Sequence, residues 1–90
     1  MGRTHKEEIV LSKEIEAASS QLTVGAKYRH YKSRDKIYKV IGLGFLEAHD
    51  EICVIYQAQY GKKFTFLRPL TVWLEHVEWE GNSVPRFTKI

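Results

Sequence analysis

The 90-residue sequence contains a single cysteine, two prolines and two aspartates, and it has no apolar run of the about 18 residues that a membrane helix needs. Because Cys53 has no second cysteine to pair with, an intrachain disulfide is excluded and a reducing compartment is favoured. The N-terminal segment mixes charges among its apolar residues and therefore lacks the apolar core of a signal peptide. We expect a cytoplasmic protein with no membrane segment.

The sequence also has few of the residues that metal sites and active sites require. Its four histidines have no spacing that gathers metal ligands, and Cys53 falls inside an apolar β-prone run, where a buried thiol is inert. Both aspartates lie in predicted turns, and "GLG" lacks the helix and the lysine of a phosphate-binding loop. We therefore predict no metal and no cofactor, and an enzyme is the less favoured interpretation.

An N-terminal helix is predicted by a capping signal and an apolar stripe. Thr4 and Glu7 have the spacing of a capping box, and the serines at positions 19 and 20 indicate where the helix ends. A helix this short needs a packing partner, so residues 1–22 are expected to form an extension that packs on the rest of the chain or, less favoured, on a peptide or a second copy of the chain. The stripe at helical spacing consists of Leu11, Ile15, Ala18 and Leu22.

Residues 23–90 have the period-2 pattern of a β domain, with turn residues between short strands. Gly42 and Gly44 interrupt one long strand and indicate a bulge or bend. Pro69 is expected to end a strand, residues 70–73 to form a turn or helical corner, and "EGNS" to form a tight turn with Gly and Asn at positive φ. Five or so strands at this spacing predict a small closed barrel. The expected strands are 27–31, 37–48, 52–60, 64–68, 75–79 and a short closing strand at 84–87.

Several ordered motifs resemble those of the small bacterial proteins grouped as domain of unknown function 1653. They are "GAKYRHYK", "YKVIGLG", "VIYQAQYG", "LRPL" and "VPRF", between Val24 and Phe87. Ala58 and Gln59 depart from the family pattern, in which a larger apolar residue usually precedes "YG". The resemblance implies a mainly β fold, a small SH3-like five-stranded barrel after the N-terminal helix, and no established activity. Nucleotide-processing domains fused to some relatives suggest nucleotide-related ligands.

The stretch "KYRHYKSRDKIYK" contains six basic residues and four aromatic residues, counting His30, which is one footprint of a phosphate-binding surface. A period of 2 places Tyr28 and His30 on one face and Arg29 and Tyr31 on the other. Tyr28, Tyr38 and Trp79 are interpreted as packing residues. The candidate ligand-binding residues are Arg29, His30, Tyr31, Lys32, Tyr60, Arg68, Trp73 and Arg86.

Arg68 and Arg86 each stand beside a proline, where a strand ladder is interrupted. A fixed backbone at these two places could direct both guanidinium groups into a shared cleft. The alternative, weighed nearly equally, is an ion pair with Glu75 or Glu47 that holds a corner of the barrel closed.

Three functions are compatible with these residues. The favoured one is a non-catalytic binding module for a phosphate-bearing ligand, either a nucleotide or single-stranded nucleic acid. The second is a protein-interaction domain that uses an aromatic groove or the helix stripe to bind a peptide or a second copy. The third is a small enzyme acting on nucleotides, which would need an acid or a thiol in the cleft.

Overall fold

The computed structural model describes residues 5–90 and begins with the helix α1, Glu8–Ser19. Glu7 occupies the N-cap position in extended conformation and forms no side-chain capping bond. A capping box requires the glutamate at the third helical position, so Glu7 does not take the place that the prediction gave it. Thr4 lies outside the described residues. The predicted end of the helix is confirmed, because the Ser19 and Ser20 hydroxyls donate to the carbonyl oxygens of Ile15 and Ala17 at 2.8 and 2.7 Å.

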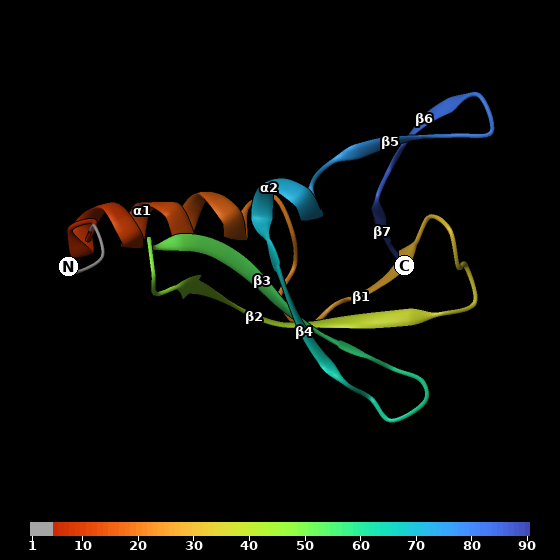
Figure 1. Cartoon of the computed structure of the whole chain (residues 1–90), viewed down its shortest axis with the longest axis horizontal. Coiled ribbons are helices and arrows are strands. Elements are labelled where there is room, and N and C mark those ends of the chain that lie inside the picture. The colour runs from red at the N-terminus through yellow and green to blue at the C-terminus, as the bar shows by residue number, and fades with distance from the viewer. Residues whose placement is uncertain (1–4) are drawn as a thin grey trace.

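The apolar stripe of α1 faces its own chain. Ala18 is completely buried and Leu22 is 5% exposed, and both belong to the same hydrophobic cluster as Val40 and Val54 of the sheet. Leu11 and Ile15 are only half-buried. The favoured expectation for the helix is thus confirmed at its C-terminal half, which anchors α1 along one face of the sheet (Figure 1).

A five-stranded antiparallel sheet forms the centre of the molecule, with the strand order β4-β3-β2-β1-β7. Two further strands form a separate hairpin, β5-β6, which projects beyond the sheet (Figure 1). The four-residue helix α2, Leu70–Trp73, forms the predicted corner between sheet and hairpin. The strands are β1 Lys27–His30, β2 Ile37–Leu46, β3 Glu51–Ala58, β4 Thr65–Pro69, β5 His76–Trp79, β6 Asn82–Pro85 and β7 Phe87–Lys89.

Most strand predictions are confirmed, including the irregularity in the long strand. The register of β2 against β3 shifts between Val40 and Gly42, so a bulge lies next to the first of the two predicted glycines. Pro69 ends β4, which is an edge strand, as its missing N–H requires. In the "EGNS" turn, the positive φ angles belong to Glu80 and Gly81, at 52° and 83°, and not to Asn82, which already begins β6.

The prediction of a closed barrel is not confirmed by the strand pairing. Within residues 5–90, β4 and β7 remain the two edges of an open sheet. After Pro69 the chain turns through α2, and β5 and β6 then pair with each other instead of extending the ladder. The closing strand begins at Phe87 and pairs only with β1, so the fold is mainly β, with antiparallel sheets and one short N-terminal helix.

Three aromatic rings in mutual contact form the centre of the hydrophobic core. They belong to Tyr56, Trp73 and Phe87, which we call the ring core. Trp73 and Phe87 stack at 3.8 Å between ring centroids, and Tyr56 meets Trp73 at 4.9 Å and Phe87 at 5.7 Å. Cys53 is buried nearby in β3, as predicted. Burial, with a smaller contribution from the charge of Glu51, raises the pKa of the Cys53 thiol, which keeps it protonated and unreactive.

Candidate functional site

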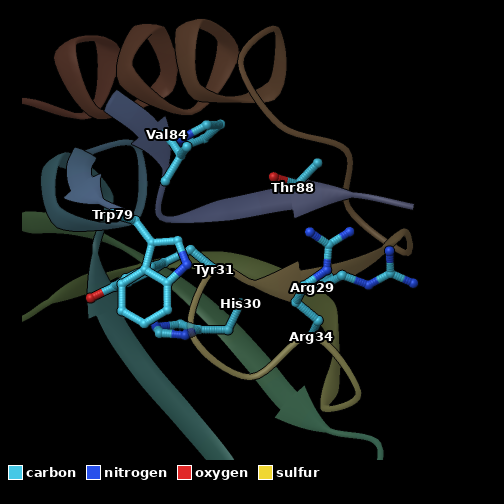
Figure 2. Close-up of a pocket in the computed structure, with 8 residues that line it drawn as sticks. Arg29, His30, Tyr31, Arg34, Trp79, Val84 and Thr88 are labelled. Atoms are coloured by element: carbon cyan, nitrogen blue, oxygen red, sulfur yellow. The ribbon is translucent and has the colours of Figure 1, made fainter. Parts of the chain in front are cut away.

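A pocket of about 270 Å³ opens between the end of β1, the loop that follows it, the β5-β6 hairpin and β7 (Figure 2). Its volume is just below the roughly 300–1,000 Å³ of ordinary small-molecule sites, so it accommodates one small ligand group. The residues that line this ligand pocket are Arg29, His30, Tyr31, Arg34, Trp79, Val84, Pro85 and Thr88.

Aromatic rings form one end of the ligand pocket. The strand β1 ends at His30, and the backbone N–H of Tyr31 donates to the carbonyl oxygen of Arg86 at 3.0 Å. The Tyr31 ring then lies 4.6 Å from the His30 ring and meets Trp79 edge-on at 5.3 Å (Figure 2). The prediction that His30 and Tyr31 point to opposite faces is therefore wrong, because the alternation stops where the strand ends.

Two arginines form the other end of the ligand pocket. Arg29 lies on β1 opposite Thr88 of β7, and Arg34 lies in the loop that follows β1 (Figure 2). The Nε atom of Arg29 is buried without a hydrogen-bond partner in the described part of the chain. Within residues 5–90 neither arginine forms an ion pair, and none of the eight lining residues is acidic. The pocket is therefore positively charged and aromatic.

His30 is neutral in this environment. Burial lowers the pKa of His30, and the positive charges of Arg68, Arg86 and Lys32 lower it further. The backbone N–H of Lys32 donates to Nδ1 of His30 at 3.1 Å, so the Nδ1 lone pair accepts this bond and the proton of the neutral ring lies on Nε2. His30 thus lines the pocket without adding a charge.

Three of the eight residues that sequence analysis singled out lie in or beside the ring core, outside the lining of the pocket. Trp73 is 3% exposed and is a core residue, so its assignment as a ligand contact is wrong. Arg68 donates from Nε to the Tyr56 hydroxyl at 3.2 Å, and its guanidinium lies 5.5 Å from the Phe87 ring centroid. Arg86 pairs with Glu75 at 2.7 Å, which confirms the alternative interpretation for that arginine.

Tyr60 lies beyond the ring core, where its hydroxyl is 2.6 Å from that of Tyr38. Burial, followed by this hydrogen bond, raises the pKa of Tyr38 to about 12. The structure therefore brings only Arg29, His30 and Tyr31 of the candidates into the lining of one pocket, and the exposed Lys32 stands next to them in the loop.

The main pocket residue that sequence analysis missed is Trp79, which was interpreted as packing. Trp79 ends β5 and pairs with Asn82 across the hairpin turn, so it lies at the tip of a two-stranded hairpin that has no helix behind it. Such a hairpin has no core of its own to bury the ring. The sequence signal for an accessible ring at this position was an aromatic residue directly before the "EG" of a predicted turn. Arg34 and Thr88 had no sequence signal that separates them from ordinary surface residues.

Residues 5–90 contain no cluster of three or more histidine, cysteine or acidic side chains that could hold a metal ion. In the same part of the chain, no helix has the length and apolar character needed to cross a membrane.

The fold places the chain among small, mainly β proteins, and this chain has a basic and aromatic pocket beside the edge strand β7. The family described as "Protein of unknown function (DUF1653)" matches residues 26–89, and the chain belongs to this family. The crystal structure of a DUF1653 protein from Bordetella bronchiseptica is similar, with a TM-score of 0.67 and 30% identity over 78% of this chain and 90% of that chain. No curated protein matches the sequence.

Proposed function

We propose that the protein is a non-catalytic binding module for a phosphate-bearing ligand, either a nucleotide or single-stranded nucleic acid. The observation that supports this proposal is the ligand pocket, which combines a pair of aromatic rings with two arginines that form no ion pair within residues 5–90. Aromatic faces stack on bases, and guanidinium groups bind phosphate through two parallel hydrogen bonds.

In the proposed complex the base lies against Tyr31 and Trp79, and the phosphate lies at Arg29 and Arg34. The half-buried Val84 offers an apolar wall, and the exposed Thr88 lies opposite Arg29 on the neighbouring strand. A cationic ligand is disfavoured, because the two arginines would repel it and no carboxylate lines the pocket to attract it.

Two further properties belong to the same proposal. The curved five-stranded sheet, with its bulge in β2, supports an SH3-like relationship in which the hairpin β5-β6 stands in the place of a closing strand pair. A cytoplasmic location is supported by the buried, unpaired Cys53, because free thiols are typical of reducing compartments.

The test is a titration of isotope-labelled protein with adenosine monophosphate and, separately, with a short single-stranded oligonucleotide. We expect shifts of the amide signals of residues 29–34 and 88 and of the Trp79 indole N–H. The Arg34→Ala variant should bind about tenfold more weakly, because it loses a charge-assisted contact to phosphate. Lys39→Ala is the matched control, since Lys39 is exposed on β2 and does not line the pocket. Unchanged pocket signals at millimolar concentrations of both ligands would contradict the proposal.

A second candidate, self-association through α1, is favoured by one observation. Ile9 and Val10 of α1 are 64% and 42% exposed, and Leu11 next to them is only half-buried. A second copy of the chain would cover these side chains. Sedimentation of the full chain tests this, with Leu11→Glu expected to convert a dimer to a monomer; a monomer for the unmodified chain at high concentration removes the candidate.

A further inference from the structure

A second hollow adjoins the ligand pocket. It has a volume of about 370 Å³ and lies between the C-terminal end of α1 and β7. Pro85 of β6 and Thr88 of β7 line both hollows, so the two hollows are neighbours on either side of these residues. The remaining residues that line the second hollow are Ser19, Ser20, Gln21, Leu22, Thr23, Tyr28, Phe87 and Lys89.

The second hollow is partly apolar and partly polar, and it carries one positive charge. Leu22, Pro85 and Phe87 are its apolar residues, and the rest of the lining offers hydroxyl and amide groups and the ammonium group of Lys89, which donates to the Thr23 hydroxyl at 3.2 Å. None of these ten lining residues is acidic. The hollow therefore suits a sugar and a phosphate better than a second aromatic ring.

The pairing of β1 with β7 fixes the positions of the positive charges. Arg29 lies opposite Thr88, and the next pair along the strands, Tyr28 and Lys89, follows directly. Arg29 and Arg34 are thus on one side of Thr88, and Lys89 is on the other side. A ligand with one negative charge would contact one of these groups, whereas a polymer with repeated charges would contact both.

We propose that the ligand pocket and the second hollow form one binding path for single-stranded nucleic acid, in preference to a free mononucleotide. This inference rests on the function proposed above. One base occupies the space at Tyr31 and Trp79, the backbone crosses β7 at Thr88, and the next phosphate meets Lys89. Because each hollow is close to the lower limit for a small-molecule site, the path accommodates about two nucleotides.

The experiment compares thymidine monophosphate, a phosphorylated thymidine dinucleotide and a thymidine hexanucleotide, with Trp79 fluorescence and amide shifts as readouts. We expect the dinucleotide to bind about tenfold more tightly than the mononucleotide, and the amide of Lys89 to shift only with the two longer ligands. Lys89→Ala should remove most of this gain and reduce the salt dependence of oligonucleotide binding by about one phosphate contact.

Three variants make the result specific. Lys89→Arg should restore the gain, because it keeps the charge, and Lys39→Ala should have no effect on any ligand. Arg34→Ala should weaken the mononucleotide and the dinucleotide alike, because its contact belongs to the ligand pocket. Lys89 is exposed at the sheet edge, so its replacement leaves the hydrophobic core intact, which a thermal melt will verify.

The outcomes separate this inference from the function on which it rests. Equal affinities for the mononucleotide and the dinucleotide, with shifts confined to the ligand pocket, would overturn the extended path and leave the phosphate-binding module standing. A dinucleotide gain that Lys89→Ala does not change would also overturn the path. Failure of all three ligands to shift either hollow would overturn both proposals.

Discussion

The ring core and the ligand pocket contain similar residues, but these residues have partners within the protein in the first region and lack them in the second. Each combines a tryptophan, a tyrosine and nearby arginines, and both include edge-on ring contacts. In and beside the ring core, Arg68 donates to Tyr56 and Arg86 pairs with Glu75, and Trp73 is covered on its flat face by Phe87. In the ligand pocket, the arginines form no ion pair within residues 5–90, and Trp79 is half-buried.

The difference shows that aromatic and basic residues indicate a binding surface only where their ring faces and hydrogen-bond donors are not already used by other residues of the chain. A guanidinium that already donates to a hydroxyl or a carboxylate has fewer donors left for a phosphate. A ring that is stacked inside the protein has no face left for a base. The ring core therefore holds the fold together, and the ligand pocket is the region that remains chemically available.

The largest expected effect distinguishes the two tryptophans. Trp73→Ala should lower the free energy of unfolding by about 3–5 kcal/mol, because it leaves a cavity beneath Phe87 in a core with little spare stability. Trp79→Ala should lower it by about 1 kcal/mol or less, because the ring lies at the tip of a hairpin. Urea denaturation followed by circular dichroism measures both changes.

The binding assay of the same pair of variants should show the reverse order. Trp79→Ala is expected to weaken oligonucleotide binding by the loss of one stacking contact, which contributes about 1–3 kcal/mol in such sites. Trp73→Phe, which keeps a ring in the core, should fold and bind normally. A strong loss of stability in Trp79→Ala together with unchanged binding would erase the distinction between the two regions.

Local patterns were sufficient to predict most of the fold. The strand positions, the bulge near Gly42 and the end of β4 at Pro69 each depend on residues that are close in sequence. The closed barrel depended instead on which strands pair across the chain, and the hairpin β5-β6 pairs with itself. Short-range periodicity contains no information about this choice.

Contacts between distant segments also decide why one tryptophan is buried and the other is accessible. Trp73 and Trp79 are six residues apart in the sequence; Val72 and Leu74 flank the first, and Glu78 and Glu80 flank the second. One is enclosed because α2 packs on the sheet, and the other remains accessible because the hairpin leaves the sheet. Arg29, His30 and Tyr31 could be predicted to lie together because the motif that contains them is continuous, whereas Thr88 enters the pocket only through the pairing of β1 with β7.

A smaller effect is expected at the rim of the ring core, where Tyr38 and Tyr60 share a hydrogen bond at 2.6 Å. Tyr60→Phe removes this bond and should cost about 0.5–1 kcal/mol, because the bond is solvent-exposed. The pKa of Tyr38 should fall below its value of about 12 but stay above 10, since burial, the larger cause of the shift, is unchanged. Ultraviolet titration of the tyrosinates measures the change, and Tyr31→Phe is the control. A pKa of Tyr38 that remains at about 12 would contradict the assigned bond.

The smallest expected effect concerns His30, whose ring contacts both regions: it meets Phe87 at 5.2 Å and Tyr31 at 4.6 Å. Its pKa is lowered in the folded protein, so the unfolded chain binds a proton at a higher pH than the native state does. Stability should therefore be highest above pH 6.5 and should decrease as the pH falls from 6.5 to the lowered native pKa, below which this contribution is constant.

His30→Asn should flatten this slope, because its amide oxygen can accept the Lys32 backbone N–H without titrating. Denaturation between pH 5 and 7.5 measures the slope, with His76→Asn, at an exposed position of β5, as the matched control. Titration of the His30 C2–H signal gives the pKa directly, and a value at or above 6.5 would contradict both the burial of the ring and the effect of Arg68 and Arg86 on it. A lowered value means that burial, together with the nearby cations, keeps His30 neutral, which leaves the charge of the ligand pocket to Arg29 and Arg34.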